Sequence, residues 1–176
     1  MDFSPPLREG YPGMLVRVIG LLDETVIAKV ELFFDADWHL LERLYLIEPG
    51  AEGWNLLELG FKPGEDGTSE VEEVRLMREI DPLSAPSWDE LTPTTLEHNG
   101  MLFRFVGEGG GKGVIIGADN QYRLIGTSLW KTFEARANDT THLLVYATWD
   151  GGSGVYAGLL VSQDDAHIRL AEAPIS

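Results

Sequence analysis

The sequence predicts a mainly β protein (all-β to α+β), with antiparallel sheets of the sandwich or barrel type. Two observations predict this class. Short apolar or β-branched runs recur along the 176 residues, and glycine or Asx turns separate them. No helical pattern of 10–15 residues alternates with these runs, which disfavours a parallel doubly wound sheet. We expect one or two short helices beside the strands.

The first half of the chain contains three clear strand patterns and two ambiguous ones. The clear strands are Met14–Gly20, Thr25–Phe34 and Trp54–Leu59. In Trp38–Glu48 the leucine spacing allows a helix, but the turn that follows favours a strand. In Glu70–Glu79 a capping box formed by Ser69 and Glu72 would indicate a helix, whereas the alternation indicates an edge strand. We slightly prefer a strand there.

The second half follows a Pro/Ser-rich segment and has the stronger β signal. That segment contains one expected helical turn, Ser87–Leu91, with Ser87 as its N-cap. The expected strands are Met101–Gly107, Gly113–Gly117, Gln121–Ile125, Leu129–Ala135, His142–Trp149, Val155–Ser162 and His167–Leu170. The sequence thus predicts an N-terminal arm (1–13), a first β lobe (14–80), a linker with the helical turn (81–100) and a second β lobe (101–176). The two lobes could also pack as one domain.

Two internal similarities suggest that the lobes are related. Met14–Gly20 resembles Met101–Gly107, and Trp38–Glu42 resembles Trp130–Glu134, in the same order. A duplicated β unit would explain this order. Chance similarity between β-strands is the alternative.

Composition excludes several classes of function. With 13 Lys and Arg against 29 Asp and Glu, the net charge is −16, so the chain should repel nucleic acid and anionic membranes and attract cations. The absence of cysteine excludes disulfides, thiolate metal sites and a cysteine nucleophile. No apolar run reaches the roughly 20 residues of a membrane span, and the N-terminus does not resemble a signal peptide. We therefore expect a cytoplasmic protein.

The glycine-rich run Gly107–Gly113 superficially resembles a phosphate-binding loop. A P-loop requires glycine at the position of Val106 and serine or threonine at that of Gly113, so the motif fails. The run is predicted to be a flexible hairpin loop between two strands.

Candidate site residues fall into two groups, and neither is catalytic. Asp35, Asp37 and His39 combine oxygen and imidazole ligands, so they are candidates for a metal site, with an ordinary acidic turn as the alternative. Aromatic side chains could line a groove for a ligand or partner, although most such residues form β-sheet cores. The candidates in this group are Trp38, Trp130, Trp149 and Tyr156. No cofactor is expected.

Part of the sequence resembles the bacterial YjfK-like family. That family has a V-x-E-V-[KR]-L strand, an acidic D-x-x-S…W segment and a G-x-x-[YF]-x-R strand. The matching residues are Val71, Glu73, Val74, Arg75, Leu76, Asp81, Ser84, Trp88, Gly100, Phe103 and Arg104.

The C-terminal part is similar to the closing region of domain-of-unknown-function family 4178. The matching residues are Trp130, Phe133, Leu144, Tyr146, Trp149, Gly152, Gly158, Val161 and Ile168. Neither family has an established activity. Both are encoded beside phage-shock-like proteins, small membrane proteins and polyamine-ligating enzymes, so either resemblance implies a cytoplasmic accessory in bacterial envelope stress.

These observations favour a non-catalytic, acidic binding or adaptor module. Its expected partner is a protein or a cationic small molecule such as a polyamine. The alternative is a carboxylate-based hydrolase or lyase with a cleft in the β fold.

Overall fold

The computed structural model describes residues 10–35, 39–47, 53–63, 69–85, 94–117, 119, 121–164 and 166–172. Nearly all of this part of the chain is antiparallel β-sheet, which confirms the predicted class. A single 3-10 turn, η1 (Pro82–Ser84), is the one helical element among these residues, with Asp81 as its N-cap. No helix in the described ranges is long and apolar enough to cross a membrane.

Eleven strands of the described residues make up the sheet. They are β1 (Leu15–Val18), β2 (Leu22–Phe34), β3 (Leu40–Leu46), β4 (Leu56–Pro63), β5 (Ser69–Ile80), β6 (Thr95–His98), β7 (Met101–Ile116), β8 (Tyr122–Ala137), β9 (Thr140–Trp149), β10 (Gly152–Ser162) and β11 (Ile168–Ala171). The ambiguous segments Trp38–Glu48 and Glu70–Glu79 therefore contain strands β3 and β5. The predicted helical turn at Ser87–Leu91 lies outside the described residues.

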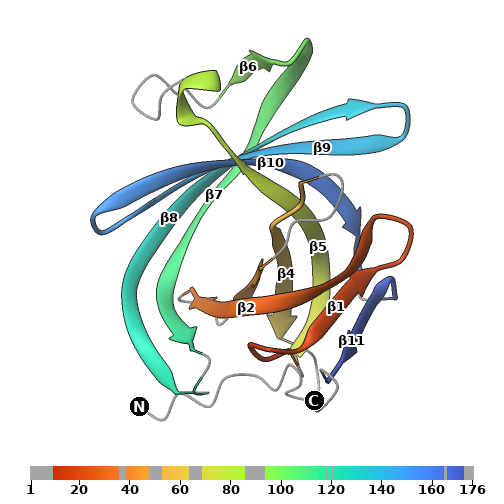
Figure 1. Cartoon of the computed structure of the whole chain (residues 1–176). Helices are drawn as coiled ribbons and strands as arrows, with labels where there is room; N and C mark the ends of the chain where they lie inside the picture. The colour runs from red at the N-terminus through yellow and green to blue at the C-terminus, as the bar shows by residue number, and fades with distance from the viewer. Residues whose placement is uncertain are drawn as a thin grey trace.

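Eight of the strands form a closed ring (Figure 1). The hydrogen-bonded order β2-β3-β4-β5-β10-β9-β8-β7 returns to its start because β7 also pairs with β2. β1 branches from β2 and carries β11, while β6 pairs with the beginning of β7. The predicted barrel-like sheet is thus a barrel of eight strands with additional strands outside it.

The ring consists of two four-stranded meanders with the same topology. β2–β5 come from residues 14–80 and β7–β10 come from residues 101–176, and the two sets meet at the antiparallel seams β5–β10 and β2–β7. The predicted linker, 81–100, contains η1 and β6. Hydrogen bonds at both seams join the halves into one sheet, so neither half has a complete barrel wall of its own.

The two internal similarities do not align with this topology. Met14–Gly20 forms β1 outside the barrel, whereas Met101–Gly107 begins the barrel strand β7. Glu42 and Glu134 lie on topologically equivalent strands. However, the two side chains point in different directions. Glu42 precedes the cavity-lining Arg43 on β3 and therefore faces away from the cavity, whereas Glu134 interacts electrostatically with the inward-facing Arg75. The two meanders therefore share their topology, but the similar sequence segments do not occupy equivalent positions with the same side-chain direction.

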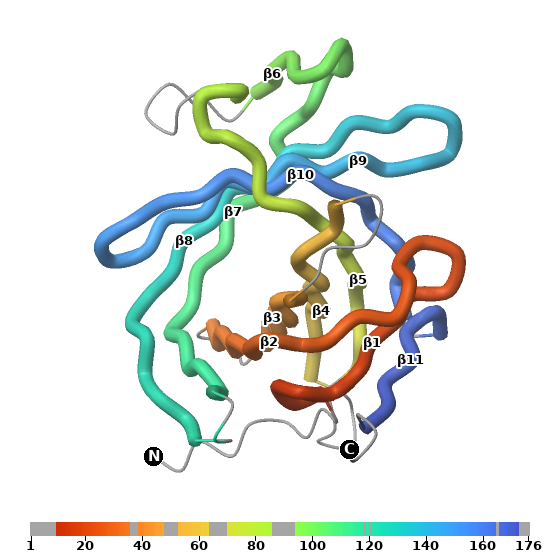
Figure 2. The backbone as a smooth tube through the Cα atoms, in the orientation of Figure 1, coloured from red at the N-terminus to blue at the C-terminus, as the bar shows by residue number. Residues whose placement is uncertain are grey.

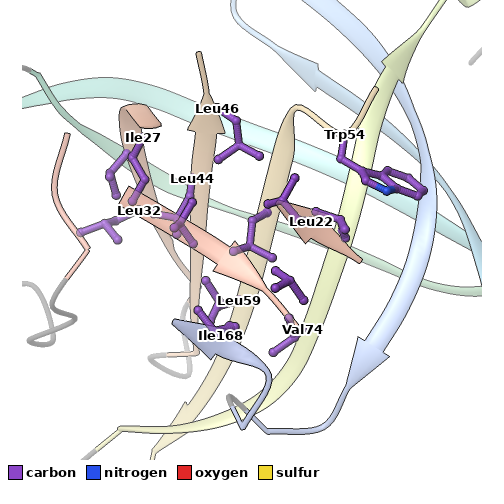
Figure 3. Close-up of a cluster of buried hydrophobic side chains, with 14 of the residues drawn as sticks. Leu22, Ile27, Leu32, Leu44, Leu46, Trp54, Leu59, Val74 and Ile168 are labelled. Carbon is purple, nitrogen blue, oxygen red and sulfur yellow. The ribbon is translucent and has the colours of Figure 1, made fainter. Parts of the chain in front are cut away.

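Apolar clusters cover the outside of both meanders. The larger one packs the outer faces of β2–β5 against β1 and β11 (Figure 3), and includes Val16, Leu32, Leu44, Val74 and Ile168. The other packs Phe103, Phe133, Leu144, Tyr146 and Val155 against partly buried residues from β6 and the segment around η1. Because the outer faces are buried as well, the strands show less polar alternation than strands with one solvated face.

The glycine-rich run was predicted wrongly. Gly107–Gly113 is not a loop but the middle of β7, paired along its length with β8. Apart from Gly107, each of its glycines lies so close to a neighbouring group that an added Cβ would meet it at less than 3 Å. A Cβ on Gly109 would lie 2.2 Å from Trp130 Nε1, and a Cβ on Gly111 would lie 2.6 Å from the backbone oxygen of Phe34. The run is rich in glycine because side chains and the backbone of β2 approach β7 closely. The sequence alone suggested that the glycines make a flexible loop.

Replacing Gly111 should destabilise the barrel at the β2–β7 seam. In Gly111→Ala the new methyl group collides with the Phe34 backbone, which cannot rotate away, so we expect a loss of about 1–3 kcal/mol of unfolding free energy. Gly107→Ala is the matched control on the same strand, because nothing lies within 4 Å of its Cβ position. Urea unfolding measures both. Equal midpoints for the two variants would contradict the close approach.

Candidate ligand-binding cavity

A cavity of about 420 Å³ lies against the inner wall of the barrel. The strands that contribute its lining are part of the ring seen in Figure 2. Alternation along β2 identifies the wall, because Lys29, Glu31 and Phe33 line the cavity whereas Val30 and Leu32 belong to the outer cluster. The full lining is Lys29, Glu31, Phe33, Arg43, Tyr45, Glu79, Ile115, Ile125, Thr127, Ser128, Trp149 and Tyr156.

A β-bulge in β2 brings the charged residues to this face. The register of β2 against β3 shifts between Ile27 and Lys29. As a result, Ile27 packs in the outer cluster while Lys29, two residues later, faces the cavity. A strand without this irregularity would place both side chains on one face.

Charges of alternating sign follow one row across four strands of the inner wall. Glu31 on β2 is opposite Arg43 on β3, Arg43 is opposite Glu58 on β4, and Glu58 is opposite Arg75 on β5. We call Glu31, Arg43, Glu58 and Arg75 the charge ladder. Cross-strand pairing places opposite charges side by side at every step.

The centre of the ladder is an ion pair that is almost completely buried. Arg43 Nε lies 2.8 Å from Glu58 Oε1, and these side chains are 5% and 3% exposed. Although this distance is short, Nε has no hydrogen bond, so the attraction is mainly Coulombic. The second oxygen of Glu58 lies 3.9 Å from Arg75 Nη1, while Arg75 Nη2 lies 2.6 Å from Glu73 Oε2. One carboxylate thus serves two guanidinium groups.

Electrostatic attraction keeps both ladder arginines charged in spite of their burial. Burial disfavours the guanidinium form of Arg43, but Glu58, with smaller contributions from nearby groups, outweighs it and raises the pKa. Burial likewise opposes the charge on Arg75, and Glu58 followed by Glu73 raises its pKa. These arginines are therefore permanent cations inside the barrel.

Two tyrosines flank the guanidinium group of Arg43 on the cavity side. Its Cζ lies 4.9 Å from the ring centroid of Tyr156 and 5.5 Å from that of Tyr45, which is cation–π range. Burial raises the pKa of both phenols, although Arg43 opposes the shift. Both tyrosines are therefore neutral at physiological pH and can act as hydrogen-bond donors.

Lys29 and Glu31 form a second charged group, nearer to solvent. Lys29 Nζ lies 3.2 Å from Glu31 Oε1 and 4.2 Å from the ring centroid of Tyr45. The Tyr45 hydroxyl donates a hydrogen bond of 2.9 Å to Glu31 Oε2. The ammonium group is thus held by a carboxylate and an aromatic face that belong to the protein itself.

The structure brings two of the four predicted aromatic residues to the cavity and a third next to it. Trp149 and Tyr156 line the cavity. Trp130 packs edge-on against the lining residue Phe33, with ring centroids 5.9 Å apart. Trp38 lies outside the described residues. Ligand binding by these residues stays a prediction.

The candidate metal residues are only partly described. His39 Nδ1 lies 3.1 Å from Asp35 Oδ2, and the His39 backbone amide donates to Asp35 Oδ1 at 2.9 Å. Asp37 lies outside the described residues, and the residues around it that are described contain no group of three or more metal-ligating side chains. These contacts join the residue after β2 to the residue before β3, and metal binding stays a prediction.

Sequence reasoning missed the charge ladder and the Lys29–Glu31–Tyr45 group. The available signal was the presence of charged residues inside otherwise apolar strands, such as Glu42 and Arg43 within LLERLYL. That signal does not show which of the two charges faces inward. Only the strand register, which is set by contacts distant in sequence, places Arg43 opposite Glu58.

Comparison of the chain with protein-family models, curated proteins and solved structures finds no match. The resemblances to the YjfK-like family and to family 4178 therefore stay predictions, and the function has to be argued from the geometry of the cavity.

Removing the charge of Glu58 should destabilise the fold strongly. Glu58→Gln keeps the shape of the side chain but leaves the buried Arg43 without its carboxylate, which costs about 3 kcal/mol or more. We expect a correspondingly lower urea midpoint. The double variant Arg43→Met with Glu58→Leu should be more stable than Glu58→Gln, because no buried charge then lacks a partner. A Glu58→Gln midpoint equal to that of wild type would show that the pair contributes nothing.

Stability should decrease as the pH rises above about 10. The unfolded chain releases its tyrosine protons near pH 10, whereas the raised pKa values of Tyr45 and Tyr156 keep these protons on the folded protein. Above pH 10 the unfolded state thus binds fewer protons and gains relative stability. Urea midpoints between pH 9 and 11 would measure the slope, which should be shallower for the double variant Tyr45→Phe/Tyr156→Phe. An unchanged slope would contradict the assignment.

Proposed function

We propose that this chain is a non-catalytic binding module that holds a small organic molecule inside its barrel. The observation that carries the proposal is the cavity of about 420 Å³, which is of the size that small-molecule sites have in other proteins. Eight-stranded barrels are wide enough to hold one small ligand. The mixed aromatic, aliphatic and polar lining is typical of such sites.

The construction of the wall also supports a preformed binding site. Each ring strand is hydrogen-bonded on both sides over at least part of its length, and apolar clusters cover the outer faces of both meanders. A binding site in a wall of this kind requires little reorganisation when the ligand enters, which lowers the entropic cost of binding.

The state of the charged groups favours binding over catalysis. Arg43 is engaged by Glu58, and Glu31 is engaged by both Lys29 and Tyr45. A group held in this way orients a ligand more readily than it transfers a proton. The presence of two carboxylates in the lining, Glu31 and Glu79, favours the second candidate, a carboxylate-based hydrolase or lyase.

The wider setting of the proposal comes from the sequence. The charge of −16 supports a basic protein or a cationic small molecule as the partner of a chain that we propose to be cytoplasmic. The resemblances to the YjfK-like family and to family 4178 imply that such a binding module would be an accessory in bacterial envelope stress.

The proposal predicts that filling the cavity abolishes ligand binding. Ile115 lines the cavity from β7, so Ile115→Trp should occupy its volume, whereas Ile115→Val should leave it open. A library of small metabolites is screened by saturation-transfer NMR against both variants and wild type. We expect compounds that bind wild type and Ile115→Val with similar affinity and bind Ile115→Trp at least tenfold more weakly. Hits that bind all three proteins equally would overturn the cavity as the site, and turnover of a hit would favour the enzyme.

A further inference from the structure

The charges of the inner wall are not balanced. Among the described residues, four cations, Lys29, Arg43, Arg75 and Arg104 (the last opposite Glu134 in the register of β7 and β8), face five carboxylates that pair with them or act on them and their neighbours electrostatically. The carboxylates are Glu31, Glu58, Glu73, Glu79 and Glu134. The interior therefore has an excess of negative charge, within a chain whose net charge is −16.

Glu79 is the carboxylate of this set that lines the cavity without an ion pair among the described residues. It lies directly opposite Tyr156 in the register of β5 and β10. Its negative charge contributes to the raised pKa of Tyr156, after burial as the main cause, so the carboxylate acts on that ring. Because Glu79 is exposed, a ligand can reach it from solvent.

Trp149 provides an accessible aromatic surface in the same part of the cavity. Its side chain is 40% exposed although it lines the cavity. The ring lies against two glycines of β10, since a Cβ on Gly152 would be 2.8 Å from Trp149 Nε1 and one on Gly154 would be 3.2 Å from Trp149 Cη2. The same Gly154 position is 3.4 Å from the Tyr156 hydroxyl, so both rings lie beside Gly154.

The cations of the lining are already engaged. Arg43 is buried against Glu58 between two tyrosines, and Lys29 is held by Glu31 over the ring of Tyr45. An anionic ligand would have to compete with these carboxylates, and would also be repelled by Glu79. A cationic ligand would meet the Glu79 carboxylate, which has no ion pair in the described part of the chain, and the Trp149 ring, without breaking any of these contacts.

We infer that the ligand of the barrel is an organic cation, an ammonium group attached to an apolar body. The ammonium group binds between the Glu79 carboxylate and the exposed ring of Trp149, and the apolar body contacts Ile115 and Ile125. This inference rests on the proposed function, because it assigns the ligand class of the same cavity.

Three probes of similar size and different charge test the inference by isothermal titration calorimetry on the full chain. They are 2-phenylethylamine (cation), 2-phenylethanol (neutral) and 3-phenylpropionate (anion). We expect the amine to bind about tenfold more tightly than the alcohol, since a cation–π contact together with a carboxylate supplies a factor of this size. The anionic probe, 3-phenylpropionate, should bind most weakly.

Variants separate specific binding from general attraction to an acidic protein. Glu79→Gln should weaken amine binding about tenfold and leave alcohol binding unchanged. Glu72→Gln is the matched control, because it removes one charge from an exposed position of the same strand that does not line the cavity. Trp149→Leu should also weaken amine binding, by removing the aromatic face.

The possible outcomes distinguish this inference from the proposed function. If the alcohol or the carboxylate binds as tightly as the amine, and Ile115→Trp abolishes that binding, the cation assignment is wrong and the cavity remains a binding site. If Glu79→Gln and Glu72→Gln weaken the amine equally, the attraction is non-specific and the inference fails. If none of the probes binds and the metabolite screen gives no hit that depends on the open cavity, both proposals fail.

Discussion

Pairing between β2 and β7 is the constraint on which the rest of the structure depends. This pairing spans Val30–Phe34 and Lys112–Ile116, and it converts an open sheet into a ring. Without it, Lys29, Glu31 and Phe33 would lie at the edge of a sheet and would not form one wall of a cavity. The glycines of β7 permit the pairing, because a Cβ on Gly111 would collide with the Phe34 backbone. Closure also covers the edges of β2 and β7 at this seam, which would otherwise be open to pairing with another chain.

The charge ladder is compatible with the barrel only because the register is fixed. A one-residue shift between β3 and β4 would turn Glu58 away from Arg43 and place a leucine inside. Buried charges are costly when unpaired, so shifted registers are penalised more strongly than they would be in a purely apolar wall. We suggest that the ladder contributes more to the uniqueness of the fold than to its stability.

The sequence was sufficient for the class and for most of the strands, because these depend on local patterns. It also singled out Trp149 and Tyr156, which line the cavity. It was insufficient where distant segments decide. Gly107–Gly113 indicated a loop, since nothing in the sequence shows that Trp130 and Phe34 lie against it. Arg43 and Glu58 were not recognised as a pair, since they come from different strands whose register depends on the whole ring. Burial of both strand faces also weakened the polar alternation from which side-chain direction is inferred.

The barrel remains partly open because its aromatic rings lie along the wall. Three rings follow the same rule: Trp130 lies against Gly109, Phe33 against Gly113 and Trp149 against Gly152. In each case the missing Cβ on the opposite strand leaves room for a ring that would otherwise have to project toward the axis. An eight-stranded barrel with side chains at these positions would have a filled interior. The glycines of β7 and β10 therefore have one physical role in common, which is to leave space for large aromatic rings along the wall. Phe33 and Trp149 line the cavity, whereas Trp130 packs against buried apolar residues such as Leu56 and Met77.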